Sequence, residues 1–192
     1  LELDTERLDY KADEGVARTD EPVRFRRGKS SGSSRGLDYR SEGGTLDLKA
    51  DVKLRLENEA GPPTEIEAGA ARATRDERRV VFDGGTIVRQ GARELHSERL
   101  QLIFNPATDA IERAAAIEDV DLRVGPGAPM PGMAASEGGE KRLRCRKLQV
   151  FFRARGILSE ATAVNPASLE VLPGRRDAQE RRLLETDLLH FV

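Results

Sequence analysis

The chain has 192 residues, of which 38% are hydrophobic, 4% are aromatic and 34% are charged, and it contains no Trp. Its 32 Lys and Arg nearly balance 34 Asp and Glu, so no strong net field would attract nucleic acid or an anionic membrane. No run of about 18 apolar residues predicts a membrane helix, and no signal-peptide pattern is present. Because the chain begins at Leu1, without Met and inside an expected strand, we expect it to be a piece of a longer protein.

The N-terminal residues predict an antiparallel hairpin. Residues 1–11 alternate weakly between apolar and polar side chains, and the turn residues ADEG at 12–15 precede an expected strand over 16–27. Pro22 has no N–H to donate to a ladder, which places this strand near an edge or at a bulge. A Gly/Ser loop at 28–34 then follows.

The clearest element is residues 45–57, TLDLKADVKLRLE, which follow a short expected strand over 35–41 and an EGG turn. Apolar side chains occupy every second position, and charged side chains occupy most of the positions between them. Successive side chains of a strand point to opposite faces, so this pattern predicts a long strand with one apolar and one charged face. Asp47 and Asp51 share the charged face, where cross-strand ion pairs with Lys and Arg are expected.

The rest of the chain predicts a continuing antiparallel meander. Strands are expected over 64–74, 78–90, 94–104, 110–124, 141–153 and 156–172. Gly84 and Gly85 suggest a bulge or bend within one strand. Residues 125–139 hold five Gly and three Pro, which predicts a long flexible loop. Residues 178–192 fit either a strand or an amphipathic helix.

Internal repetition favours the strand for residues 178–192. Five segments share a central leucine, which is followed by an aromatic or aliphatic side chain two residues later in the first four and three residues later in the last. The leucines are Leu8, Leu37, Leu100, Leu148 and Leu188. The repeated unit is a hairpin that recurs about every 30 to 50 residues, and the C-terminal segment begins a new unit.

Residues with catalytic or metal-binding potential are few and do not form a known arrangement. His96 and His190 are far apart in the sequence and lack the spacing of a two-ligand metal motif, so we expect no metal site and no cofactor. The single cysteine, Cys145, cannot form an internal disulfide. It is expected to be a small buried side chain, with a reactive thiol as the alternative. These features predict that the protein is not an enzyme.

The apolar strand faces remain as the candidate functional feature. In one interpretation they pack into a closed core, and in the other they line an open groove that holds a long apolar ligand such as an acyl chain. The groove candidates are Leu8, Phe25, Leu37, Leu46, Leu48, Val52, Leu54, Leu56, Val81, Ile87, Leu100, Leu102, Ile117, Val120 and Leu122.

The order of motifs in residues 1–57 resembles the periplasmic domain of LptC, a component of lipopolysaccharide transport. The segments LDTERLDY, TDEPVRF, SRGLDY and LDLKADVKLRL follow one another, as in that family. Residues 58–192 resemble the related OstA-like units of LptA and of the N-terminal part of LptD, with LHSERLQLIFNPATDAIERAAAIEDVDLRV the best stretch. The resemblance therefore divides the chain into an LptC-like unit at 1–57 and OstA-like units at 58–192 that continue the same fold.

The resemblance implies an antiparallel β-jelly roll, a rolled, V-shaped stack of hairpins that is open along one side. It also implies that the interior receives the lipid A acyl chains of lipopolysaccharide on their way from the inner membrane toward the outer membrane. Partners would be other Lpt bridge proteins, joined edge to edge by strand pairing, and the ABC transporter complex of the inner membrane. The protein would be periplasmic, anchored to or docked at the inner membrane in its full length.

Two other functions remain as alternatives. A structural β-solenoid scaffold would use the same apolar faces as a closed core without a lipid ligand. A polysaccharide-acting enzyme would need paired acids and aromatic platforms in a cleft, and two Tyr with no Trp argue against it.

Overall fold

A computed structural model describes residues 2–58, 61–108, 110–128, 139–153, 157–172 and 182–191. The chain divides into two compact units, Leu1–Gly91 and Ala92–Val192. Both are built from β-strands, joined in the first unit by one short 3-10 turn, η1 (Glu42–Gly44). Within these described ranges, no helix is long and apolar enough to cross a membrane.

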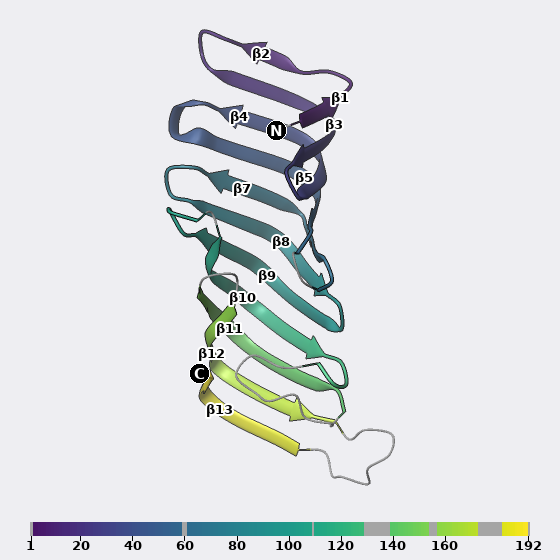
Figure 1. The fold of residues 1–192 in the computed structure, drawn as a ribbon, viewed down its shortest axis with the longest axis vertical. Helices are drawn as coiled ribbons and strands as arrows, with labels where there is room; N and C mark the ends of the chain where they lie inside the picture. The colour runs from purple at the N-terminus through teal and green to yellow at the C-terminus, as the bar shows by residue number, and fades with distance from the viewer. Residues whose placement is uncertain are drawn as a thin grey trace. The chain divides into compact units, whose positions relative to one another are not determined.

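The first unit is an antiparallel meander (Figure 1). Its strands are β1 (Glu2–Thr5), β2 (Asp9–Lys11), β3 (Val16–Arg27), β4 (Ser30–Arg40), β5 (Thr45–Leu56), β6 (Thr64–Ala68), β7 (Ala70–Thr74) and β8 (Arg79–Gln90). They lie in the order β1-β3-β4-β5-β6-β8, with β2 paired to β3 and β7 paired to both β5 and β8. The predicted strand over 45–57 is β5, and the predicted N-terminal hairpin forms through β1, β2 and β3.

The second unit continues the pattern of strands that pair with their sequence neighbours. Its strands are β9 (Arg93–Phe104), β10 (Ile111–Val124), β11 (Lys141–Arg153), β12 (Ile157–Val171) and β13 (Arg182–Phe191). The ladders β9-β10, β10-β11, β11-β12 and β12-β13 are all antiparallel. The strand predicted for the C-terminal segment is confirmed as β13, whereas most of the loop predicted at 125–139 lies outside the described residues.

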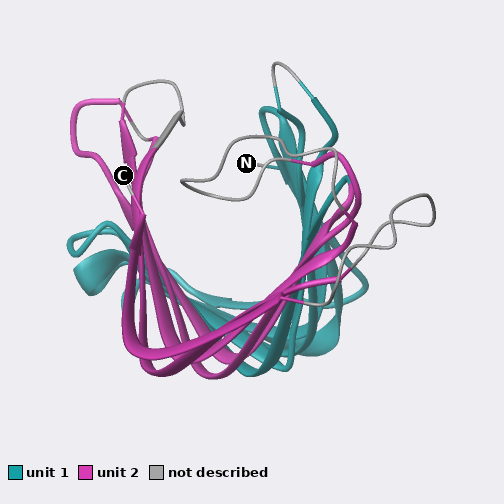
Figure 2. Cartoon of the chain, turned by 90° about the horizontal axis from the view of Figure 1, so that it is seen from below, with its two compact units in different colours: residues 1–91 teal, residues 92–192 magenta. Residues whose placement is uncertain are grey.

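The predicted antiparallel all-β class is confirmed, and the sheet of each unit is bent. Viewed as in Figure 2, the strands of each unit curve around one side and leave the opposite side open. We call the concave face of each sheet the inner face and the convex face the outer face.

The bend coincides with irregularities in the middle of the long strands. The β3-β4 register shifts between Thr19 and Pro22, as the proline predicted. In β8, Gly84 and Gly85 both have φ of 79°, which confirms the predicted bulge or bend. In β10, Glu118 and Asp119 have positive φ where the register with β9 and β11 shifts. Bulges bend a strand and increase its local twist, so aligned bulges curve a whole sheet.

Hydroxyl side chains satisfy backbone groups at several of these bends. Thr19 Oγ1 accepts a hydrogen bond from Glu21 N over 3.1 Å. Ser34 Oγ donates to Gly36 O over 3.2 Å, and Ser97 Oγ donates to Arg99 O over 3.1 Å. A bulge leaves some backbone N–H and C=O groups without a partner on the next strand. The hydroxyl of a nearby Ser or Thr can form the hydrogen bond instead.

The inner face is buried although each unit has a single sheet. In the first unit, one row across the strands contains Val23, Ser34, Val52, Ala68 and Thr86, and the next contains Thr19, Leu37, Leu48, Ala71 and Phe82. Each of these side chains is buried. In the second unit a comparable row contains Leu100, Ala116, Leu148 and Ala163, with exposures of 4%, 2%, 4% and 0%.

The outer face carries cross-strand ion pairs. Arg72 Nε lies 2.5 Å from Asp47 Oδ1, and Arg35 lies 3.2 Å from Asp51. In the second unit, Arg142 Nε donates to Asp121 Oδ1 over 2.8 Å. The prediction of ion pairs on the charged face is confirmed for both acids of β5. Pairs this exposed contribute little individually, so the fold depends mainly on the inner face.

Asp121 is the most enclosed acid among these pairs. Its substitution therefore tests whether an ion pair on the outer face contributes to stability. Burial would raise the pKa of its carboxyl, but hydrogen bonds from Arg142 and Arg123 outweigh that effect and hold the pKa below its ordinary value. The carboxylate therefore stabilises the fold above about pH 4, and this contribution is lost as the pH falls through the lowered pKa. We expect Asp121→Asn to lower the free energy of unfolding by about 1 kcal/mol at pH 7.

Urea unfolding of the wild type and the variant at pH 7 and pH 3 measures this difference. The gap between them should be smaller at pH 3 than at pH 7, because the contribution of the carboxylate is lost as the pH falls from its ordinary pKa toward its lowered pKa in the fold. Asp119→Asn, a matched change at an exposed position two residues earlier, should have little effect at either pH. Equal losses at positions 119 and 121 would show that the ion pair has no special role.

Candidate functional site

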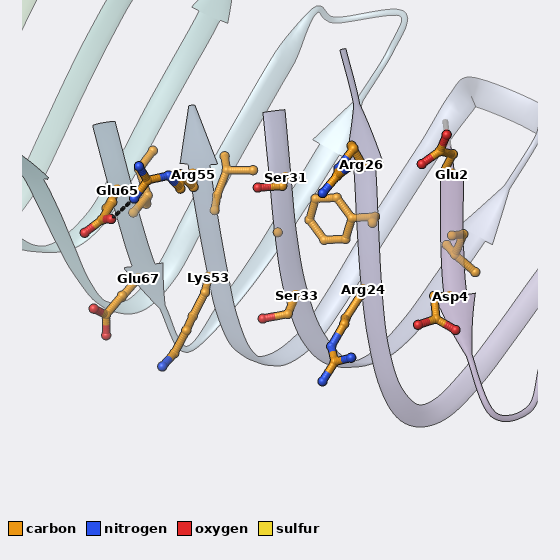
Figure 3. Close-up of a pocket in the computed structure, with 15 residues that line it drawn as sticks. Glu2, Asp4, Arg24, Arg26, Ser31, Ser33, Lys53, Arg55, Glu65 and Glu67 are labelled. Carbon is orange, nitrogen blue, oxygen red and sulfur yellow. Dashed lines mark hydrogen bonds and ion pairs between the residues drawn. The ribbon is translucent and has the colours of Figure 1, made fainter. Parts of the chain in front are cut away.

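A groove of about 600 Å³ crosses β1, β3, β4, β5 and β6 of the first unit. Its apolar lining is a single cross-strand row of Leu3, Phe25, Gly32, Leu54 and Ile66. The lining is completed by the charged and polar residues that stand immediately before and after each row residue in the sequence. Arg24, Lys53 and Glu67 are labelled examples in Figure 3. The groove therefore has an apolar floor one residue wide that continues over five strands.

Gly32 creates the space for an aromatic side chain in this row. A Cβ atom at position 32 would lie 2.5 Å from Phe25 Cζ and 2.6 Å from the carbonyl oxygen of Lys53. The Phe25 ring therefore lies against the backbone of β4, at a place where any larger residue would displace it. Phe25 and Leu54 are half-buried and Leu3 is 37% exposed, so this row is open at its surface.

A second groove, of about 1140 Å³, follows the bend of β10 to β13 in the second unit. Its inner-face lining comprises Val120, Cys145, Ala167 and Thr186, and bulge residues such as Asp119 lie beside them. This groove is more polar than the first because it follows the bulges, which place charged side chains next to the inner face.

Most of the predicted groove residues lie on the inner face. They are Phe25, Leu37, Leu46, Leu48, Val52, Leu54, Leu56, Leu100, Leu102, Val120 and Leu122. Among them, Phe25 and Leu54 line the first groove and Val120 lines the second, whereas Leu37, Val52 and Leu100 lie in the buried rows. Leu8 belongs to no strand and is 41% exposed.

Three predicted groove residues lie on the outer face instead, so the prediction is wrong for them. Val81 pairs with Arg72, Ile87 pairs with Glu67, and Ile117 pairs with Lys147. Their immediate neighbours Phe82, Thr86 and Ala116 take the inner positions. An apolar residue next to another apolar residue in a strand must face the other way, because side chains alternate.

The two grooves also contain apolar lining residues that were not predicted, among them Leu3, Ile66, Cys145 and Ala167. The alternation of LELDT and of TEIEA marks Leu3 and Ile66 as apolar-face positions, so a stricter use of period two would have found them. Cys145 and Ala167 lie beside bulges, where the alternation is interrupted and gives no such signal.

The structure favours the interpretation of Cys145 as a buried apolar side chain. The cysteine is 7% exposed, and burial raises the pKa of its thiol to about 11. Only the thiolate is strongly nucleophilic, so the side chain is nearly unreactive at neutral pH. Within the described ranges, no group of three or more His, Cys, Asp or Glu could hold a metal ion.

Alkylation of the folded protein tests this interpretation of Cys145. At pH 8 we expect a rate about one hundredfold below that of an exposed thiol, because a pKa raised by about two units reduces the thiolate fraction to that extent. The rate should increase as the pH approaches 11 or when the protein is unfolded. Arg146→Cys in a Cys145→Ser background supplies the exposed control one residue away, and equal rates at the two positions would refute the burial argument.

The groove of the first unit lies largely in a segment with a recognisable family pattern. Residues 1–57 match the family model "Lipopolysaccharide-assembly, LptC-related". This confirms the LptC resemblance for the range on which it was based. The LptC-related segment supplies β1 to β5, whereas the compact unit continues through β8 to Gly91. The domain boundary predicted at residue 57 stays a prediction.

Comparison with known proteins adds two further findings. Among solved structures, the chain is similar to LptH, the LptA homologous periplasmic component of the lipopolysaccharide transport device from Pseudomonas aeruginosa. The two share 11% sequence identity with a TM-score of 0.49, over 57% of this chain and 78% of that chain. No curated protein sequence matches the chain significantly.

Proposed function

We propose that this chain is a periplasmic lipopolysaccharide-binding domain that passes lipid A acyl chains along an open apolar groove, from an inner-membrane transporter toward the outer membrane. One observation carries the proposal. Four of the five residues in the apolar floor of the first groove, Leu3, Phe25, Gly32 and Leu54, lie within the LptC-related segment. The family is one of lipopolysaccharide assembly and its members are not enzymes.

The shape of the groove suits a ligand that is held and then released. Burial of one CH₂ group stabilises a complex by about 0.8 kcal/mol, so a fully enclosed pocket would retain a lipid with several acyl chains too tightly for transfer. A floor one residue wide, with Leu3 and Phe25 partly exposed, covers one side of a chain and leaves the other uncovered. Partial burial gives intermediate affinity, which allows movement between equivalent sites.

Partners and location follow from the same proposal. Lipopolysaccharide would be the ligand, and the inner-membrane ABC transporter complex would supply the energy that this domain lacks. Other bridge proteins would join the sheet through strand pairing at its edges, since an edge strand presents unpaired N–H and C=O groups.

The structural scaffold remains a second candidate because part of the inner face is closed. Val23 and Val52, which lie across the middle of the first unit, are 0% and 1% exposed. A protein whose only role is assembly would need such rows and no groove. The two candidates differ in whether the open row beside these residues contacts lipid.

Site-specific photo-crosslinking in cells that produce lipopolysaccharide distinguishes the two functions. A photoreactive residue at Leu54 should capture lipopolysaccharide, because its side chain forms the groove floor. The same residue at Lys49, an exposed position on the outer face of the same strand and outside the groove, is the matched control and should capture little. Ile87, on the outer face, should behave like Lys49.

The two outcomes have opposite meanings. Capture at Leu54 that exceeds capture at Lys49 severalfold supports the lipid groove. Equal capture at the two positions, or none at Leu54, contradicts it and favours the scaffold.

A further inference from the structure

The apolar floor of the first groove is a single inner-face row, and the inner-face rows on its two sides differ from it. On one side lies the buried row that contains Val23 and Val52, which are 0% and 1% exposed. On the other side, near the strand ends, lies a row of Arg27, Ser30, Leu56, Thr64 and Gln90. That second row is polar apart from Leu56. A ligand on the floor is therefore confined to the width of one side chain.

The floor has a deep end and a shallow end. Ile66 on β6 is 2% exposed, whereas Leu3 on β1, the edge strand of the sheet, is 37% exposed. Phe25 and Leu54 lie between them and are half-buried, and the Phe25 ring covers the position of Gly32 on β4. The floor is thus an unbroken slot that runs across the strands from a buried end to an open edge.

The length of the slot follows from the number of strands that it crosses. It crosses five adjacent strands, which lie side by side in Figure 3. Adjacent strands are about 4.8 Å apart, so the slot is about 19 Å long. Carbon–carbon bonds of about 1.5 Å advance an extended chain by about 1.25 Å per carbon. The slot therefore underlies about 15 carbons of such a chain.

The charges that line the groove balance one another. Four cationic residues and four acids contribute to the lining, and all of them are labelled in Figure 3. They are Arg24, Arg26, Lys53, Arg55, Glu2, Asp4, Glu65 and Glu67. A lining without net charge suits an uncharged aliphatic chain. A polar head group at the buried Ile66 end would lose its hydration, so the head group belongs at the Leu3 end.

We propose that this slot holds a single linear acyl chain of about 15 carbons, laid across the strands with its methyl end at Ile66 and its head group beyond Leu3. The inference rests on the proposed lipid-binding function and specifies how many chains the groove takes, how long they are and which way they point. A lipid with several acyl chains then places one of them in this slot at a time.

A series of single-chain lipids tests the length of the slot. The probes are alkylphosphocholines with chains of about 8 to 18 carbons, each added to the whole protein chain below its micelle concentration, with displacement of a fluorescent fatty acid as the measurement. Full burial of one CH₂ group raises affinity about fourfold, so contact along one side should raise it about twofold per carbon. We expect this increase to stop at about 15 carbons, since further carbons extend past Leu3 into water.

A second comparison tests the width of the slot. A short-chain diacyl phosphocholine should bind about as tightly as the single-chain lipid of the same chain length, because the second chain finds no apolar row beside the first. An affinity gain of about tenfold or more from the second chain would overturn the one-chain width.

Variants at the floor test where the chain lies. Leu3→Ser removes the shallow end, so the affinity should stop rising about four carbons earlier, while shorter chains bind as before. Leu8→Ser is the matched control, because Leu8 is an exposed leucine of the same unit outside the groove. It should leave the whole series unchanged. Leu54→Ser interrupts the middle of the floor and should weaken binding of every probe.

The outcomes separate this inference from the proposed function. Affinity that rises through the whole series, or that does not depend on chain length, overturns the slot and leaves lipid binding intact. Equal behaviour of Leu3→Ser and Leu8→Ser, or unchanged affinities in Leu54→Ser, place the chain elsewhere and also overturn it. Absence of binding by every probe overturns the inference, and the proposed function is overturned with it only if Leu54 also fails to capture lipopolysaccharide in cells.

Discussion

The structure depends on how a single sheet buries one of its own faces. An antiparallel sheet ordinarily covers its apolar face with a second layer. In each unit described here the bend provides the cover instead, because side chains on a concave surface converge. Val23, Val52 and Phe82 are buried in this way in the first unit, and Leu143 and Ala163 in the second. The bulges that produce the bend are therefore as important to the core as the apolar residues are.

Concavity also explains the composition of the buried rows. Leu100, Ala116, Leu148 and Ala163 alternate large and small side chains across four strands, and Leu48, Ala71 and Phe82 do so in the first unit. Side chains that converge from a curved surface cannot all be large, so each bulky residue needs a small neighbour. This need for small inner residues accounts for Ala114 and Ala116 of β10, whereas Ala115 between them faces the outer side.

The curvature of the sheet also limits how well the sequence predicts which residues line the inner face. The alternation of residues 45–57 predicted β5 and its faces, since no apolar residue there competes for the outer face. In β10 the larger Ile117 was expected inside, but the concave face takes Ala116, and Ile117 faces out beside Lys147. Size and hydrophobicity favour the wrong residue when curvature limits the space. Period two gives the faces of a strand, whereas curvature depends on bulges whose alignment across strands is not visible in any one segment.

The open row of the first unit bears on whether the inner face is a conduit or a solid core. Leu3, Phe25, Gly32, Leu54 and Ile66 form an apolar floor across five strands, and Leu3 is 37% exposed. The adjacent row through Val23 and Val52 is closed. A core that serves only assembly gains nothing from apolar side chains that stay partly in water, because each exposed CH₂ group forgoes the free energy of its burial. The open row therefore acquires a physical reason if the inner face holds an apolar chain.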